Sequence, residues 1–198
     1  MIVGGIFGRK KSGKTTLAKH LGKEYWQSED RRSLVLDPNA TDTWGPEFWV
    51  TSDADLYWAT AWSTEHCLLI VDDAGKAIDR DSALTDAFTR INHNGHKLLV
   101  IGHDGVNLTR VMREQMDTLY LFAAGSKAVE KWEEIFPDTP PPKGISKAAW
   151  AREIRSRKVK GEKVNAPIDM EDAMYLKRFE FLYIRQYEPI ERMKLQAP

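Results

Sequence analysis

The segment GRKKSGKTT, residues 8–16, has the residue types and the spacing of a phosphate-binding loop. Gly8 is followed by four residues and then by the triplet Gly13, Lys14 and Thr15. The glycines let backbone amides turn toward a phosphate, and the N-terminus of a following helix adds partial positive charge. Lys14 is expected to reach the β- and γ-phosphates of a nucleotide, and the Thr15 hydroxyl is expected to bind Mg²⁺.

The sequence on either side of this segment predicts the elements that such a loop needs. Residues 2–7 are an apolar run typical of a buried strand, and Leu17, Leu21 and Tyr25 follow at helical spacing. Strand, loop and helix in this order predict a nucleoside triphosphate site, and the alternative is a glycine-rich turn without a ligand. The expected nucleotide-binding residues are Gly8, Arg9, Lys10, Lys11, Ser12, Gly13, Lys14, Thr15 and Thr16.

Two adjacent acids, Asp72 and Asp73, follow the apolar run CLLIV at residues 67–71. A buried strand that delivers a carboxylate is the second motif of P-loop NTPases, so Asp72 is predicted to share a magnesium ion with Thr15. Asp73 stands where hydrolases keep an acid that polarises the attacking water. A turn without chemistry is the alternative. With Gly75 the acids also fit a GTPase pattern, but no Asn-Lys-x-Asp guanine-binding motif follows a later strand.

Composition limits the classes of protein to consider. The chain has 198 residues, of which 42% are hydrophobic, and this suits one domain with an appendage and a sizeable core. Its single cysteine, Cys67, cannot form an internal disulfide, which fits a reducing compartment. No apolar run approaches the roughly 20 residues of a membrane span. The first residues lead directly into the phosphate-binding loop, and we do not interpret them as a signal peptide.

The formal net charge of zero hides a difference between two parts of the chain. Residues 1–142 carry 16 Lys and Arg against 21 Asp and Glu, whereas residues 143–198 carry 13 against 8. The excess of basic residues concentrates at 143–163, where a solvated surface segment and a polyanion-binding segment are both open interpretations. Its eight basic residues are Lys143, Lys147, Arg152, Arg155, Arg157, Lys158, Lys160 and Lys163.

Alternating strand and helix patterns predict an α/β fold. Short apolar runs that predict buried strands recur at residues 33–37, 48–50, 67–71, 97–101 and 118–122. Helical periodicity is found between several of these runs and after the last one, at residues 55–66, 82–92 and 126–136. We therefore expect a mainly parallel sheet that is covered by helices on both faces.

A proline-rich segment is predicted to end the compact core. Residues 137–144, PDTPPPKG, contain four prolines and are expected to form a semi-rigid connector between a core at 1–136 and a C-terminal segment at 145–198. In that segment Asp169 and Asp172 suit a helix start. The predicted helix has an apolar stripe made of Ala173, Leu176, Phe179, Tyr183 and Tyr187.

The stretch TRINHNGHKLLVIGH, residues 89–103, resembles the sequence that follows the second motif in the FtsK–HerA class of DNA-pumping ATPases. In that class an arginine ends a helix, and an apolar strand then leads to a polar sensor residue. The resemblance implies that Arg90 acts on the active site of a neighbouring subunit and that His103 senses the γ-phosphate. SLVLDPN at 33–39 and TRVMREQMDTLYLF at 109–122 are similar to further elements of the class.

This resemblance covers roughly residues 2–123. In length the chain is most similar to the small genome-packaging ATPases of viruses within this class. The resemblance implies a RecA/ASCE-like P-loop NTPase of three layers, to which the C-terminal segment adds a helix. Lys14, Asp73, Arg90 and His103 would be its catalytic residues. Asp73 stands where glutamate is usual in this class, and this difference concerns the rate of turnover. His103 stands where glutamine is usual, and this difference concerns how the state of the γ-phosphate is coupled to the rest of the protein.

The resemblance also implies cofactors, partners and location. ATP and Mg²⁺ are expected at the phosphate-binding loop. The expected partners are double-stranded DNA, further copies of the chain in a ring of five or six subunits, and a capsid or portal-vertex protein. DNA would be held by the basic run at 143–163 or by the loop at 75–80. The expected location is the host cytoplasm or a virion.

Two other functions stay open at this stage. One is a small phosphotransferase of the nucleotide-kinase type, although its arginine-rich lid would lie between core strands and not after a connector. The other is a phage assembly or secretion factor that uses nucleotide as a switch. Among the remaining polar and aromatic residues, His93 and His96 are expected in an exposed loop, and Trp58 and Trp62 in the core.

Overall fold

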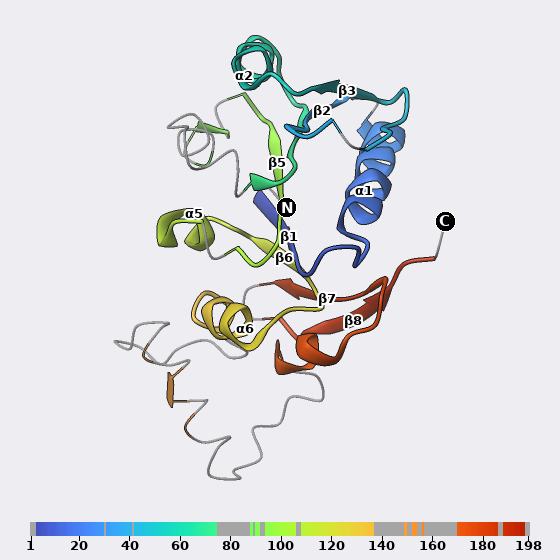
Figure 1. The fold of residues 1–198 in the computed structure, drawn as a ribbon. Helices are drawn as coiled ribbons and strands as arrows, with labels where there is room; N and C mark the ends of the chain where they lie inside the picture. Colours follow the sequence, from blue (N-terminus) through green and yellow to red (C-terminus); the bar gives the residue numbers. More distant parts are fainter. Residues whose placement is uncertain are drawn as a thin grey trace.

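A computed structural model describes residues 3–29, 31–40, 42–74, 88, 90–91, 94–105, 108–136, 149, 152–153, 156, 170–185 and 188–196. Its strands form one eight-stranded sheet in the order β3-β2-β4-β5-β1-β6-β7-β8 (Figure 1). The strands are β1 Val3–Phe7, β2 Ser33–Leu36, β3 Phe48–Thr51, β4 Leu68–Val71, β5 Lys97–Gly102, β6 Thr118–Phe122, β7 Glu180–Arg185 and β8 Glu191–Lys194. The helices are α1 Lys14–Glu29, α2 Ala54–Ser63, α5 Arg110–Glu114, α6 Ser126–Glu133 and the 3-10 helix η1 Met170–Tyr175.

The first six strands run parallel, and β1 lies at the centre of the sheet. Gly5 of β1 stands opposite Val100 of β5 on one side and Leu119 of β6 on the other. Strands β7 and β8 continue the sheet beyond β6 in antiparallel directions. Every residue of β1, β2, β4 and β6 is buried, as expected for parallel strands covered on both faces. The predicted α/β fold with a mainly parallel sheet is therefore confirmed.

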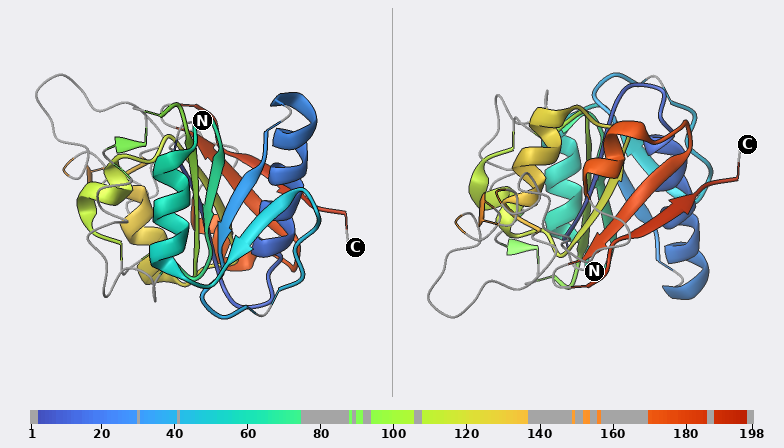
Figure 2. Two further views of the ribbon diagram at one scale, coloured as in Figure 1. Left: turned by 90° about the horizontal axis from the view of Figure 1, so that it is seen from above. Right: turned by 90° about the horizontal axis from the view of Figure 1, so that it is seen from below.

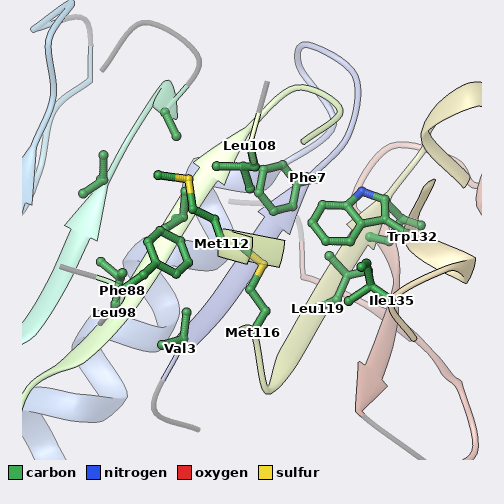
Figure 3. Packing of buried hydrophobic residues seen from close by; sticks show 14 of the residues in the cluster. Val3, Phe7, Phe88, Leu98, Leu108, Met112, Met116, Leu119, Trp132 and Ile135 are labelled. Carbon is green, nitrogen blue, oxygen red and sulfur yellow. The ribbon is translucent and has the colours of Figure 1, made fainter. Parts of the chain in front are cut away.

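Helices cover the two faces of the sheet and make three layers (Figure 2). Helix α1 packs on one face, where Leu17, Ala18 and Tyr25 join a buried cluster with residues of the strands. Helices α2, α5 and α6 pack on the other face in a second cluster. Figure 3 shows part of this second cluster, in which the rings of Phe7 and Trp132 lie 4.9 Å apart. The end of β1 is thus fixed by packing just before the predicted loop.

The helix that the sequence predicts across residues 169–187 is wrong beyond residue 175. The 3-10 helix η1 ends at Tyr175, and residues 180–185 form β7, which pairs with β6 so that Phe181 stands opposite Phe122. The four residues from Phe181 to Ile184 are apolar or aromatic, and such a short run fits strand and helix equally well by periodicity alone. Packing against the aromatic side chains of β6 selects the strand, because aromatic residues suit a pleated surface.

Several predicted segments lie outside the described residues. They include most of the helix at 82–92, the connector at 137–144 and most of the basic run at 143–163. The predicted core at 1–136 and C-terminal segment at 145–198 stay predictions as a division of the chain, although β7 and β8 extend the sheet of the core. None of the described helices is long and apolar enough to cross a membrane.

Candidate active site

The predicted phosphate-binding loop joins the carboxyl end of β1 to the start of α1. Gly8 and Gly13 have positive φ angles of 149° and 112°, which residues other than glycine rarely adopt. A Cβ atom at Gly8 would lie 2.5 Å from the Cβ of Phe122, so the turn needs glycine for space as well as for conformation. The amide of Gly8 donates to the carbonyl of His103 at 2.6 Å and fixes the loop to the end of β5.

Lys14 begins α1 and turns its side chain back into the loop. Its Nζ donates to the carbonyl oxygens of Gly8 at 3.0 Å and Arg9 at 2.9 Å. Burial lowers the pKa of Lys14, while the negative charges of Asp72 and Asp73 act in the opposite direction. A lysine ammonium group is therefore held inside the curve of the loop and within the field of the two acids.

Asp72 and Asp73 follow β4 at the same edge of the sheet as the loop. The amide of Asp72 donates to the carbonyl of Leu36, and the amide of Asp73 donates to Oδ1 of Asp72 at 2.7 Å. Burial raises the pKa of Asp72 to about 6, and nearby acidic side chains, Asp37 among them, contribute to this rise. Asp73 has a left-handed φ of 48°, which an aspartate tolerates better than most residues.

Two polar residues after β2 also join the site, although they belong to none of the predicted site motifs. Asp37 is buried and accepts hydrogen bonds from the indole Nε1 of Trp44 at 3.3 Å and from the amide of Asn39 at 3.2 Å. The side-chain amide of Asn39 donates to Oδ2 of Asp73 at 3.1 Å. Their position in the sequence could have indicated this, because polar residues that directly follow a buried parallel strand lie at the edge of the sheet where the other parallel strands also end.

A cleft of about 620 Å³ connects the loop with the acids. Thr15 and the acid pair both line it, and its lining includes the end of β5 at Gly102. Seven of the predicted site residues line the cleft, namely Lys10, Lys11, Lys14, Thr15, Asp72, Asp73 and His103. The other predicted loop residues, Gly8, Arg9, Ser12, Gly13 and Thr16, form the backbone of the loop and the first turn of α1.

Arg90 does not line this cleft. Its side chain is exposed, and it belongs to a stretch that is described only in part. Two other arginines, on α5, have structural partners. Arg113 is buried and donates to the carbonyls of Leu108 at 2.6 Å and Gly105 at 3.3 Å, while Arg110 pairs with Glu114 at 2.8 Å. Arg113 therefore stabilises the loop that follows β5.

The prediction that His96 is exposed and the prediction that Trp62 is buried in the core are both wrong. His96 is buried, and its Nδ1 accepts from the amide of Cys67 at 3.0 Å while its Nε2 lies 2.9 Å from the carbonyl of Ala61. Its ring thus joins α2 to β4, and burial lowers its pKa. Trp58 is in the core as predicted, but Trp62 stacks on it from outside and is 37% exposed. His93 lies outside the described residues.

The turn before β7 also contacts the phosphate-binding loop. The amide of Phe179 donates to the carbonyl of Ser12 at 2.9 Å, and a Cβ atom at Gly13 would lie 2.6 Å from Cδ1 of Phe179. The hydroxyl of Ser12 is buried and has no hydrogen-bond partner among the described residues. No sequence motif signals this contact, because periodicity assigned Phe179 to a helix.

The sheet order, the loop after the central strand and the acids after β4 define a P-loop NTPase-like fold. The chain is similar to the genome packaging NTPase B204 from Sulfolobus turreted icosahedral virus 2 in complex with AMPPCP, with 19% identity, a TM-score of 0.67 and coverage of 98% of this chain and 97% of that chain. VirB4 of Thermoanaerobacter pseudethanolicus matches with 12% identity, a TM-score of 0.61 and coverage of 98% and 89%.

A type VII secretion ATPase, EccC of Thermomonospora curvata, matches with 10% identity and a TM-score of 0.61, over 97% of this chain and 23% of that chain. No family model matches the sequence, and no curated protein matches it. At these identities the likeness shows the fold. The expected likeness to viral genome-packaging ATPases is confirmed at the level of the fold.

Proposed function

We propose that this chain binds a nucleoside triphosphate with Mg²⁺, hydrolyses it, and uses the reaction to move double-stranded DNA as a ring of identical subunits. The observation that carries the proposal is the cleft in which the phosphate-binding loop faces Asp72 and Asp73. The fold that holds this cleft is shared over 98% of the chain with a genome packaging NTPase. A viral packaging motor is the specific form of the proposal.

Phosphate binding is the task of the loop. The backbone amides between Gly8 and Lys14 and the N-terminus of α1 favour negative charge. Lys14 is held by two carbonyl oxygens of the loop, and the ammonium group would exchange these weaker partners for the oxygens of the β- and γ-phosphates. Lys10 and Lys11 line the same cleft and add positive charge beside it.

The oxygen groups in the cleft fit a magnesium ion. Thr15 and Asp72 both line it, and Mg²⁺ prefers hydroxyl and carboxylate oxygens. Burial of Asp72 disfavours its charged form, and a nearby cation would remove that disadvantage. When bound, Mg²⁺ supplies charge neutralisation on the phosphates. Asp72 orients the site, and Thr15 contributes its hydroxyl from the first turn of α1.

Asp73 is the proposed acid that polarises the attacking water. Its Oδ2 accepts from the side chain of Asn39, so the carboxylate is oriented by a residue of the turn that follows the adjacent strand β2. His103, at the end of β5, lines the same cleft and is the proposed sensor of the γ-phosphate. Because the carbonyl of His103 also accepts from the amide of Gly8, a change at His103 would reach the loop directly.

Ring assembly is proposed from the position of Arg90. This exposed arginine lies outside the lining of its own cleft, which suits a residue that acts on the active site of the next subunit. DNA contacts are proposed for the basic run at 143–163, most of which lies outside the described residues.

One assay tests the proposal against its two alternatives. ATP turnover is measured for the chain alone, with double-stranded DNA, and with nucleoside monophosphates. A motor hydrolyses ATP faster with DNA, a phosphotransferase phosphorylates the monophosphate, and a switch factor binds ATP with negligible turnover. Lys14→Ala should abolish turnover, while Lys127→Ala, an exposed lysine on α6, should retain it. Normal turnover by Lys14→Ala would exclude the loop as the active site.

A mixing experiment tests whether Arg90 acts across an interface. Arg90→Ala should leave ATP affinity unchanged and lower turnover by roughly 10³- to 10⁵-fold, since such arginines stabilise the transition state. Mixing it with Lys14→Ala protein should restore part of the activity, because one variant supplies the arginine and the other an intact loop. Assembled mixed rings without any rescue would exclude Arg90 from this role.

DNA contact is tested by neutralising Arg155, Arg157, Lys158 and Lys160 together. Duplex binding should weaken and its salt dependence should flatten by about 0.9 logarithmic units per lost phosphate contact. ATP turnover without DNA should not change. An unchanged salt slope would exclude the basic run as the DNA contact and would favour the loop at 75–80.

A further inference from the structure

The turn Lys177–Glu180 lies beside the phosphate-binding loop on the side opposite to the acids. In the sheet, β4 with Asp72 at its end lies two strands from β1 in one direction, and β7 lies two strands from β1 in the other. Phe181 of β7 pairs with Phe122 at the carboxyl end of β6, so the turn is at the same edge of the sheet as the loop. The loop is therefore flanked on both sides.

Phe179 connects this turn to the loop. Its amide donates to the carbonyl of Ser12 at 2.9 Å, and its ring covers Gly13, where a Cβ atom would lie only 2.6 Å from Cδ1. Phe179 has a φ of 67°, a left-handed conformation that is rare for a bulky residue and that surrounding contacts must maintain.

Neighbouring hydrogen bonds maintain the conformation of this turn. The amide of Leu195 donates to the carbonyl of Phe179 at 2.9 Å, and the amide of Lys177 donates to the carboxylate of Glu180 at 2.9 Å. Glu180 also pairs with Arg192 of β8 at 2.8 Å. The turn is thus held by both strands of the C-terminal hairpin, and strained residues that are held so firmly often belong to ligand sites.

Arg178 lies over the ring of Phe179, with its guanidinium carbon 4.7 Å from the ring centroid. Its side chain is exposed, while that of Phe179 is partly buried. The two residues make a stack of a planar cation and an aromatic ring at the border of the loop. Guanidinium groups and aromatic rings are the two side-chain types on which nucleobases stack.

We propose that Arg178 and Phe179 form the platform on which the base of the bound nucleotide stacks. This inference rests on the proposed function, because it needs the phosphates in the loop. The acids mark the side at which the γ-phosphate lies, so the ribose and base extend toward the other side, where the turn is. Stacking recognises the face of a base and not the hydrogen-bonding pattern of its edge. ATP and GTP are therefore expected to bind with similar affinity.

The test compares ligands with and without a base. Binding of ATP, GTP and inorganic tripolyphosphate is measured by calorimetry for the parent and for Arg178→Ala. The variant should bind both nucleotides about five- to thirtyfold more weakly, in the range found when a stacking partner of a base is lost. Its affinity for tripolyphosphate should not change, because tripolyphosphate has nothing to stack.

The matched control is Arg185→Ala. Arg185 also lies over an aromatic ring, that of Tyr183 at 5.2 Å, and it belongs to β7, the strand that follows the turn with Arg178. It stands opposite Thr118 at the start of β6 and hence at the other edge of the sheet. Its loss should leave all three affinities unchanged. Phe179→Leu is a second variant, which keeps an apolar side chain over Gly13 and should weaken the nucleotides but not tripolyphosphate.

Each other outcome has a definite meaning. If Arg178→Ala binds ATP as the parent does, the platform is excluded and the proposed function stands. Equal weakening of ATP and tripolyphosphate would also overturn it, since Arg178 would then act on the phosphates. If the parent binds neither ATP nor tripolyphosphate, the proposed function and the platform fall together.

Discussion

The two sides of the phosphate-binding loop are built by different physical means. On the acid side, hydrogen bonds orient polar groups after β2 and β4, and burial raises the pKa of Asp72 to about 6. On the side of the C-terminal hairpin, the aromatic ring of Phe179 packs on Gly13, and a main-chain hydrogen bond joins the two segments. The acid side thus positions partly buried carboxyl groups, whereas the hairpin side stabilises the conformation of the loop.

Because the two sides differ in this way, substitutions on each side are expected to change different properties of the protein. Substitutions on the acid side should change turnover and the pH dependence of stability, and should leave nucleotide affinity comparatively intact. Substitutions on the hairpin side should change stability and affinity first. Four predictions test this separation.

The largest effect is expected for Asp73→Asn. An amide cannot accept a proton from water, so steady-state ATP turnover should fall by about 10²- to 10⁴-fold, the usual contribution of such a group. Equilibrium binding of ATP should not change. Asp55→Asn, which changes an exposed acid in the first turn of α2, is the control and should behave as the parent. Parental turnover by Asp73→Asn would mean that another acid polarises the water.

Phe179→Ala should lower the free energy of unfolding by about 2 kcal/mol, because a partly buried ring that packs on the loop is lost. Phe179→Gly should be about 1 kcal/mol more stable than Phe179→Ala, since glycine adopts the positive φ without strain. Urea denaturation of the three proteins measures both differences. Equal stability of the alanine and glycine variants would show that the left-handed conformation carries no strain.

Asn39→Ala should lower turnover by about tenfold while KM stays unchanged, because the carboxylate of Asp73 loses one hydrogen bond to a charged acceptor. Asn39→Asp has a similar shape but lacks the donor, and it should lower turnover at least as much. If alanine and aspartate at this position both leave turnover at the parental value, Asn39 does not orient Asp73. A change in KM alone would assign Asn39 to binding and would contradict the comparison.

Asp72→Asn should stabilise the protein in the absence of Mg²⁺ and nucleotide. The pKa of Asp72 is about 6 in the folded protein and has an ordinary value of 3.8, so the folded state disfavours the charged form. The stability that this raised pKa gives is present below the lower value and is lost as pH rises through about 6. We expect the variant to gain about 1 kcal/mol at neutral pH and nothing at about pH 3 or below, where the carboxyl group is protonated in both states. Denaturation curves at several pH values measure the difference.

The parts of the site that the sequence predicted are those that are local in the chain. Strand, loop and helix occupy residues 3 to 29 without interruption, and Asp72 directly follows its strand. Each motif therefore carries its own structural context. The mainly parallel sheet followed for the same reason, because strands and helices alternate with clear periodicity.

The parts that the sequence analysis missed depend on neighbours that are distant in the chain. Asn39 contacts Asp73 only because β2 and β4 are adjacent in the sheet. The run from Phe181 to Ile184 is a strand because β6 offers aromatic side chains on which it packs. Periodicity cannot distinguish a helix from a strand over so few residues. The burial of Arg113 similarly depends on the carbonyls of a loop whose path no pattern predicts.

The hydrogen bond between Phe179 and Ser12 joins residues that are separated by 167 positions in the sequence. During synthesis the loop leaves the ribosome first, and at ordinary elongation rates the turn that covers it follows roughly 10 to 30 s later. A nascent chain in which β7 and β8 have not yet been synthesised therefore contains the residues of the phosphate-binding loop but lacks the turn that packs against them. The contact that completes this side of the loop can therefore form only after residues 177–195 have been synthesised.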